Sequence, residues 1–167
     1  MRKITTAIIL SLSASFTHAE TESFAPSVPD VKGAYDYAQK VVDTRMLLLV
    51  TSFAIQNFEH NIGCIPASPQ DLINTPDEKR LRKLSCHKNV TEAKWNFFDL
   101  ATEHYSINQD NASHMRSEFL KLKFVQNHNE PWKIEWQEPL LGGKTKTMQC
   151  SFLEANYGNC PSIPHAK

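Results

Sequence analysis

The sequence predicts an α+β protein in which one long N-terminal helix packs on a four-stranded antiparallel β-meander, with two disulfides. Three observations predict this class. Apolar residues recur at helical spacing from Val31 onward, the apolar period changes to two in the second half of the chain, and the chain has four cysteines. A helix with an apolar face is the natural cover for a sheet that has one apolar face.

The first nineteen residues, MRKITTAIILSLSASFTHA, have the pattern of a secretory signal peptide. Arg2 and Lys3 form a positive start, an apolar stretch follows, and Thr17-His18-Ala19 is a small-residue cleavage site. The apolar stretch is shorter than the roughly 20 apolar residues that span a bilayer. We therefore expect cleavage before Glu20, no transmembrane segment afterwards, and a periplasmic or secreted product.

The remaining chain is predicted to be a flexible lead, residues 20–29, and a single domain, residues 30–167. The lead has two prolines and no apolar period. The whole chain has 18 basic and 18 acidic residues, and this balance excludes the strong basic excess of a nucleic-acid-binding domain.

The long helix is predicted to begin after Asp30, a good N-cap residue, and to run to about Asn61. The helical spacing of one mostly apolar face is kept by Val31, Ala34, Tyr35, Ala38, Val41, Val42, Arg45, Leu49, Phe53 and Ile55. Gly63 can adopt the left-handed conformation that ends helices, and Pro66 and Pro69 cannot continue one. The stretch GCIPASPQDL is therefore a helix stop.

The four cysteines, Cys64, Cys86, Cys150 and Cys160, allow three pairings into two disulfides. Export to an oxidising compartment favours disulfide formation. We favour Cys64–Cys86 and Cys150–Cys160, because each closes a short loop between strongly patterned segments. Each bridge would then stabilise the fold by roughly 3 kcal/mol through loop-closure entropy.

A connector, residues 64–92, is predicted to contain a short helix over residues 77–84. The helix carries a basic run: Lys79, Arg80, Arg82 and Lys83. This run is either a patch for an anionic partner or a solvated helix face, and the second reading is the ordinary fate of charged residues.

Four segments are predicted to be half-buried antiparallel strands: 94–100, 119–126, 132–137 and 144–152. Turn residues separate the later ones, at 127–131 and 139–143. Trp95, Trp132 and Trp136 would form either a ligand-binding stripe or part of the core. At strand spacing the core is expected.

The order of elements resembles the soluble part of a type IV pilin or pseudopilin. The local match is Ala54-Ile55, Phe58, Asn61, Gly63, Pro66, Ser68 and Asp71-Leu72. The pair Cys150 and Cys160 also resembles the C-terminal disulfide loop of many pilins. Pilins keep an apolar membrane segment after leader cleavage, whereas here the apolar segment precedes the cleavage site. The resemblance therefore implies a soluble relative, such as a pilus or secretion-system accessory.

Two other functions, zinc binding and histidine-dependent hydrolysis, use residue types that this chain contains. His60, Cys64, Cys86 and His87 are residue types that bind zinc, but disulfide formation is the expected fate of these cysteines. His104 or His114 could act as a general base with Glu103, Asp99 or Asp110, within a polar segment expected to be a surface loop. The chain has no nucleophile elbow, HExxH motif or phosphate-binding loop.

The sequence therefore assigns no catalytic, cofactor-binding or metal-binding residue. It predicts an exported, non-catalytic interaction protein with an envelope or secreted protein partner. The alternatives are a small secreted hydrolase that uses His104 or His114, and a secreted enzyme inhibitor. In a eukaryotic source, Asn89 and Asn111 would be glycan acceptors.

Overall fold

The computed structural model describes residues 28–74, 77–86, 96–156 and 158–161. The predicted signal peptide and most of the predicted lead lie outside the described residues. In chain order the elements are α1 (Val28–Ile62), α2 (Pro69–Ile73), α3 (Glu78–Lys83), α4 (Phe97–His104), α5 (Gln109–Phe119), β1 (Lys123–Val125), β2 (Lys133–Pro139), β3 (Thr145–Ser151) and α6 (Phe152–Asn156).

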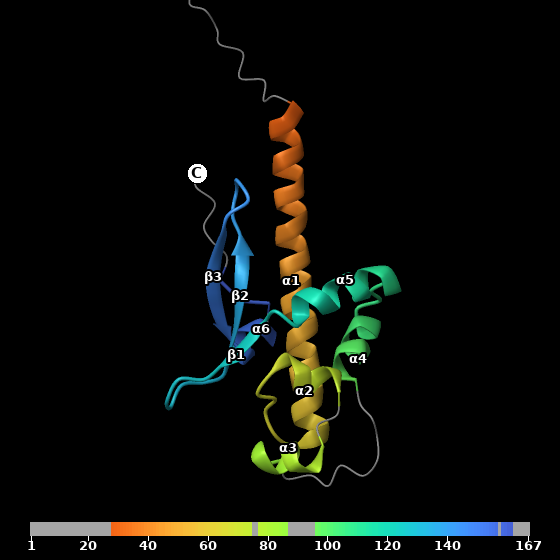
Figure 1. Ribbon diagram of the computed structural model, residues 1–167, viewed down its shortest axis with the longest axis vertical. Coiled ribbons are helices and arrows are strands. Elements are labelled where there is room, and N and C mark those ends of the chain that lie inside the picture. Colours follow the sequence, from red (N-terminus) through yellow and green to blue (C-terminus); the bar gives the residue numbers. More distant parts are fainter. Residues whose placement is uncertain (1–27, 75–76, 87–95, 157, 162–167) are drawn as a thin grey trace, which may run out of the picture.

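The long helix α1 forms the axis of the molecule, the short helices α2 to α6 gather around its lower half, and the β2–β3 hairpin extends up beside its upper half (Figure 1). The prediction of a long N-terminal helix is confirmed, with a start two residues before Asp30. The lower half is buried on several sides, by α4, α5, α6 and β2. Its buried apolar residues are Leu47, Leu48, Val50, Ala54, Ile55, Phe58 and Ile62.

The stretch after α1 ends the helix as predicted. Gly63 has a φ of 78°, and its N–H donates to the carbonyl of Glu59 at 2.9 Å. Only glycine adopts this left-handed conformation at little cost. The disulfide Cys64–Cys86 then joins the end of α1 to the residue that follows α3.

A buried carboxylate organises the turn between α1 and α3. Asp71 is 6% exposed and accepts hydrogen bonds from the backbone N–H groups of Ala67 and Ser68 and from the Ser68 hydroxyl. Arg80 donates to both carboxylate oxygens at 2.9 Å. This bidentate hydrogen bond raises the pKa of Arg80. The first arginine of the basic run is therefore a structural residue.

Among the described residues, the sheet has three antiparallel strands in the order β1-β2-β3. The prediction of four strands is wrong, because the aromatic segment that was expected to form the first strand is helical from Phe97 onward. Asn96 caps α4 by accepting a hydrogen bond from the N–H of Asp99 at 3.0 Å. Phe97, Phe98 and Ala101 then lie on one helical face and are buried.

The segment before the sheet also differs from the prediction. Residues 103–114 were expected to be a surface loop, but they comprise the end of α4 and the start of α5. Asn108 caps α5 through the N–H of Asn111. Phe119 ends α5 rather than beginning a strand, so that β1 keeps only three of the eight residues expected.

The core lies between α1, α4 and the inner face of the sheet. Phe124, Ile134, Trp136 and Cys150 alternate inward, so that the half-buried pattern predicted for these strands is confirmed. Phe58 of α1 meets Phe97 edge to face, with ring centroids 5.4 Å apart. The prediction that the tryptophans belong to the core is confirmed for Trp136, whereas Trp95 lies outside the described residues.

The C-terminal part folds back on the sheet through the disulfide Cys150–Cys160. Both favoured pairings are therefore confirmed. Beside this disulfide, Glu154 in the first turn of α6 accepts hydrogen bonds from the backbone N–H and the hydroxyl of Ser151. The backbone bond, more than the hydroxyl bond, lowers the pKa of Glu154. This reciprocal cap holds α6 at the end of β3.

Replacing Gly33 with alanine is expected to stabilise the upper half of α1. A Cβ at Gly33 would meet nothing within 4 Å, and glycine in a helix interior costs about 0.5–1 kcal/mol relative to alanine. Amide hydrogen exchange in residues 31–42 should slow by about two- to fivefold in Gly33→Ala. Peptides from α4 serve as the internal control. Unchanged or faster exchange in residues 31–42 would contradict a regular, open helix at this position.

Candidate interaction surface

The upper half of α1 is the main exposed feature of the described chain. Figure 1 shows that its first turns extend beyond the other described elements. No residue from Val31 to Met46 is buried. The physical reason is length, because 35 helical residues extend about 52 Å. A seven-residue strand such as β2 covers only about 23 Å.

Four apolar residues form one face of this upper half, and we call them the apolar stripe: Val31, Tyr35, Ala38 and Val42. Tyr35 is 70% exposed, Val42 59% and Val31 55%, and Ala38 is also exposed. Their spacings of four, three and four residues are those of the core positions in a coiled coil. The stripe is therefore an apolar helix face with no partner among the described residues.

Polar residues of both signs flank the apolar stripe. They are Lys32, Asp36, Gln39, Lys40 and Asp43, and all five are exposed. The Gln39 side chain donates to the Asp43 carboxylate at 2.8 Å, one turn along the helix. An exposed apolar face bordered by charged residues is typical of a helix that binds another helix in water.

The base of the upper half is fixed to the sheet by a buried carboxylate. Glu138 of β2 is 3% exposed and accepts a hydrogen bond from Arg45 of α1 at 2.6 Å. The indole N–H of Trp136 donates to the other oxygen of Glu138 at 2.6 Å. Arg45 also donates to the carbonyl of Pro161 at 3.4 Å. These hydrogen bonds fix the orientation of the upper half of α1 relative to the sheet.

The β2–β3 hairpin reaches toward the same end of the molecule as the upper half of α1 (Figure 1). Its tip is closed by a hydrogen bond from the N–H of Leu140 to the carbonyl of Lys144 at 2.8 Å. Gly142 and Gly143 at the tip both have positive φ, at 81° and 77°. Leu141, the apolar residue at this tip, is 70% exposed.

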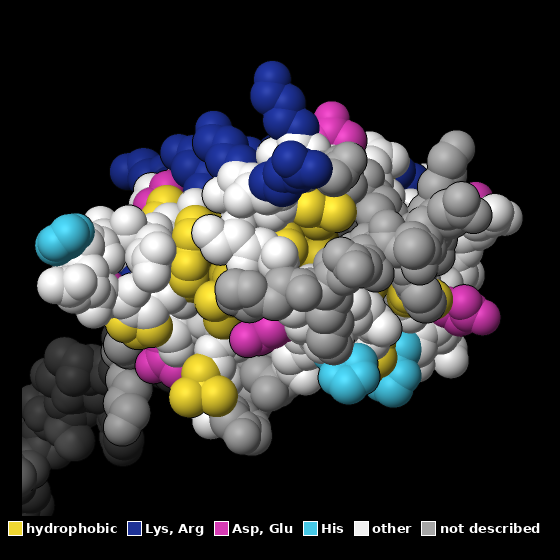
Figure 2. All heavy atoms as spheres, turned by 90° about the horizontal axis from the view of Figure 1, so that it is seen from below, with side chains coloured by type: hydrophobic (Ala, Val, Ile, Leu, Met, Phe, Trp, Pro, Cys, Tyr) yellow, Lys and Arg dark blue, Asp and Glu magenta, His cyan; other side chains and the backbone are white. Residues whose placement is uncertain are grey.

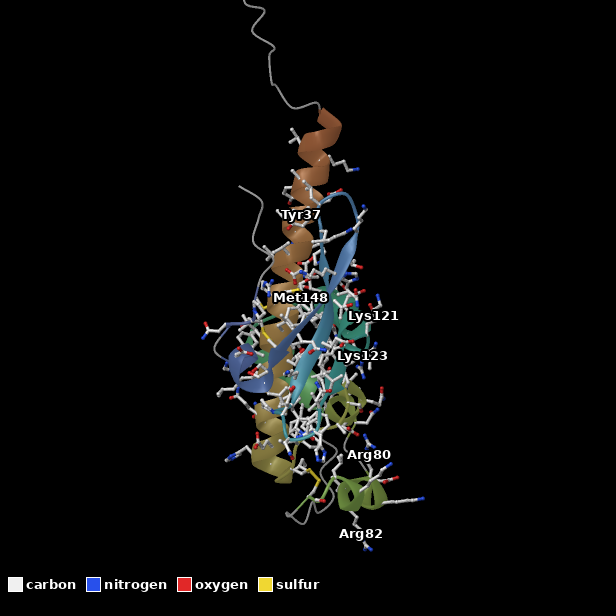
Figure 3. The ribbon with its side chains drawn as sticks, turned by 90° about the vertical axis from the view of Figure 1, so that its left-hand side faces the viewer. Tyr37, Arg80, Arg82, Lys121, Lys123 and Met148 are labelled. Carbon is white, nitrogen blue, oxygen red and sulfur yellow. A yellow bond between two sulfur atoms is a disulfide. The ribbon has the colours of Figure 1, made fainter. Side chains whose placement is uncertain are left out.

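Lysine and arginine side chains gather along the upper edge of the face drawn in Figure 2, and Figure 3 shows members of this group on one side of the molecule. The labelled members are Arg80, Arg82, Lys121 and Lys123. Carboxylates accompany several of them: Asp71 binds Arg80, Glu118 binds Lys121, and Glu135 lies 3.4 Å from Lys123. This face therefore carries mixed charge, which favours the solvated reading of the basic run.

Glu135 is an acidic residue of this face whose carboxylate contacts side chains on both neighbouring strands. Its carboxylate accepts a hydrogen bond from Gln149 of β3 at 2.8 Å, and this bond, with a smaller contribution from Lys123, lowers the pKa of Glu135. The carboxylate is on the outer side of the sheet, across from the buried Trp136 and Glu138. The Glu135 carboxylate of the central strand therefore links β1 and β3 across the outer face of the sheet.

The two candidate catalytic histidines occupy different environments. The ring of His104 stacks on Phe53 of α1, with centroids 4.0 Å apart. His114 is exposed on α5. Of the candidate carboxylates, Asp99 is bound by the Asn96 amide at 2.6 Å and lies 3.9 Å from Arg116. The contacts of these groups are those of helix caps and packing.

The other candidate carboxylates are exposed, and the two cysteines of the candidate zinc set form a disulfide. Glu103 and Asp110 are exposed at the end of α4 and the start of α5. The disulfide between Cys64 and Cys86 removes both thiolates from the proposed zinc set, and His87 lies outside the described residues. Within the residues that the structure covers, no group of three metal-binding side chains is present.

The structure also describes Trp132 and the second of the two glycan motifs. Trp132 is half-buried and stacks on Phe152, with centroids 6.2 Å apart. Asn111 of the second glycan motif is exposed in the first turn of α5. The first glycan motif, at Asn89, lies outside the described residues.

No protein-family model, curated protein or solved structure matches the chain. In the described part of the chain, no helix combines the length and the apolar character needed to cross a membrane. The two disulfides are typical of proteins outside the cytoplasm.

The apolar stripe was visible in the sequence but was assigned to the wrong environment. Its residues were predicted to belong to the face that covers the sheet. Large apolar residues occur in both halves of α1, such as Tyr35 and Val42 in the upper half and Leu47 and Phe58 in the lower half, so residue type does not distinguish the two halves. The extent of the elements that pack on α1 decides which half is covered.

Proposed function

We propose that this chain is an exported, non-catalytic interaction protein of the bacterial cell envelope, and that it binds a protein partner through the apolar stripe. One observation carries the proposal: a regular helix extends beyond the domain with Tyr35 and Val42 largely exposed on one face. Contiguous exposed apolar residues rimmed by polar ones mark interaction sites. An amphipathic helix face is a common recognition element for another protein.

The anchoring of α1 supports the same function. A binding helix gains affinity when its geometry is fixed before the partner arrives, because less conformational entropy is lost on binding. The contacts of Arg45 with Glu138 and Pro161 fix the base of the upper half. The resemblance to pilins is consistent with a role as a pilus or secretion-system accessory, since it depends on α1 and on the C-terminal disulfide loop.

A site-specific crosslinking experiment tests the proposal. A photoreactive amino acid replaces Tyr35 in the tagged full chain, which is expressed in its native cells and irradiated. We expect a discrete crosslinked product that disappears when Val42→Asp is added. Burying the new carboxylate in the interface without an opposite charge or a hydrogen-bond donor costs too much free energy. The same product should persist with Leu153→Asp, since Leu153 is 65% exposed on α6 and does not belong to the apolar stripe.

The hydrolase alternative is addressed by the same preparation. Replacing His114 with glutamine should leave the crosslinked product unchanged. Products that are equally strong with and without Val42→Asp, or the absence of any product, would contradict the proposed function.

A further inference from the structure

We propose that the partner of the apolar stripe is a second copy of this chain, paired through the upper halves of two α1 helices in antiparallel orientation. This inference rests on the proposed function and names the partner of the same surface. It is carried by the order of residue sizes along the stripe, by the charges on its flank and by the shape of the molecule.

The first step is the symmetry of the stripe. Its spacings, four, three and four residues, are the same when the helix is read in reverse. A second α1 can therefore lie antiparallel on the first with its stripe in register. In that register Val31 faces Val42 of the second copy, and Tyr35 faces Ala38 of the second copy. Core positions of antiparallel coiled helices meet in this way.

The second step is size complementarity. In the antiparallel register each large Tyr35 side chain meets a small Ala38, so the distance between the two helices stays even along the contact. A parallel pair would place Tyr35 against Tyr35 and Ala38 against Ala38. Those two neighbouring layers require different separations of the helix axes, since close packing tolerates neither overlap nor voids. The residue order therefore favours the antiparallel pair.

The third step is charge. Lys32 and Gln39 lie on the same flank of the apolar stripe, and Asp43 lies beside Gln39, to which it is hydrogen-bonded. In the antiparallel pair this flank faces itself. Lys32 of each copy then lies across from Gln39 and Asp43 of the other, so that opposite charges meet twice. Complementary flanking charges select partner and orientation in helix pairs.

The fourth step is the shape of the molecule. The short helices gather around the lower half of α1, and the first turns of α1 extend beyond all other described elements (Figure 1). An antiparallel pair places the two domains at opposite ends of the contact, whereas a parallel pair would bring them side by side. The contact extends over residues 31–42, about 18 Å of helix. The apolar stripe supplies four residues per copy, whereas a standard protein interface has about 20–30 residues a side. We therefore expect a weak, concentration-dependent dimer.

Sedimentation equilibrium of the purified full-length exported chain, from about 1 μM to 1 mM, tests this inference. We expect a monomer–dimer equilibrium that Val42→Asp weakens at least tenfold. Lys32→Glu and Asp43→Lys should each weaken it roughly threefold to tenfold, and the double variant should return to within about twofold of the original chain. Gly33→Ala, which changes the opposite side of the helix, should not weaken the dimer. Circular dichroism checks that each variant keeps its helix content.

Three outcomes would overturn the inference: a monomer at every concentration, a dimer insensitive to Val42→Asp, or a double charge variant no better than the single ones. The first of these is distinguishable from failure of the proposed function. If the chain is monomeric but the crosslinked product in cells still depends on Val42, the apolar stripe binds a different protein. If both experiments are negative, the proposed function fails as well.

Discussion

Replacing Glu138 with alanine is expected to lower the free energy of unfolding by about 2–3 kcal/mol. The change leaves the indole N–H of Trp136 and the guanidinium of Arg45 without their shared acceptor. Removing one partner of a buried ion pair costs about 3–5 kcal/mol. The expected cost lies below this range because the Arg45 side chain is 28% exposed and water can reach it. Urea denaturation followed by tryptophan fluorescence measures the change.

The matched control is Glu135→Ala, on the same strand but on the outer side of the sheet. Glu135 also pairs with a lysine, but the Lys123 side chain is 71% exposed, and pairs that are open to water contribute only about 0–1 kcal/mol. Glu138→Gln should recover part of the loss, since an amide oxygen can still accept from Trp136. If Glu135→Ala and Glu138→Ala prove equally mild, Glu138 is not the anchor of α1 that its contacts indicate.

Removing the Cys64–Cys86 disulfide by replacing both cysteines with alanine is expected to cost about 3 kcal/mol. The bridge closes a loop with a sequence separation of 22, and loop-closure entropy in the unfolded chain sets the size of the effect. Amide exchange should become faster in α2 and α3, because the bridge and the Asp71–Arg80 pair are the contacts that hold this connector. Thermal and urea denaturation with peptide-resolved exchange provide the measurement.

The second disulfide supplies the comparison. Cys150–Cys160 closes a shorter loop, with a sequence separation of 10, and its loss should leave exchange in α2 and α3 unchanged. Loss of the Cys64–Cys86 bridge without any effect on α2 and α3 would mean that the Asp71–Arg80 pair alone holds the connector.

Local signals predicted the elements that depend on nearby residues. The end of α1 follows from Gly63 and the two prolines after it, and the short helix α3 lies within the range 77–84 predicted from the sequence, with Asp77 as its cap. Both disulfides follow from loop length. In each case the deciding interaction spans few residues, so the sequence pattern contains it.

The errors arose where two structures share the same local pattern. A short aromatic run, Trp95 to Phe98, suits a buried strand as well as a buried helix. The hydrogen bond from Asp99 to the side chain of Asn96, together with a pocket for Phe97 against Phe58, selects the helix. Phe119 is similar, because its ring packs on Phe98 and therefore belongs with α5 rather than with β1.

The sequence by itself determined that this chain has one long helix with a definite end, two disulfides and a sheet with one apolar face. These features depend on period, turn residues and cysteine spacing, all of which are local. Only the tertiary structure decided which half of α1 is covered. Both halves carry an apolar face, but the short helices pack on the lower one, and the β2–β3 hairpin, which extends beside the upper one, leaves the apolar stripe exposed. The exposure of Tyr35 and Val42, and with it the candidate interaction surface, is set by the extent of the other elements and not by the residues of the stripe.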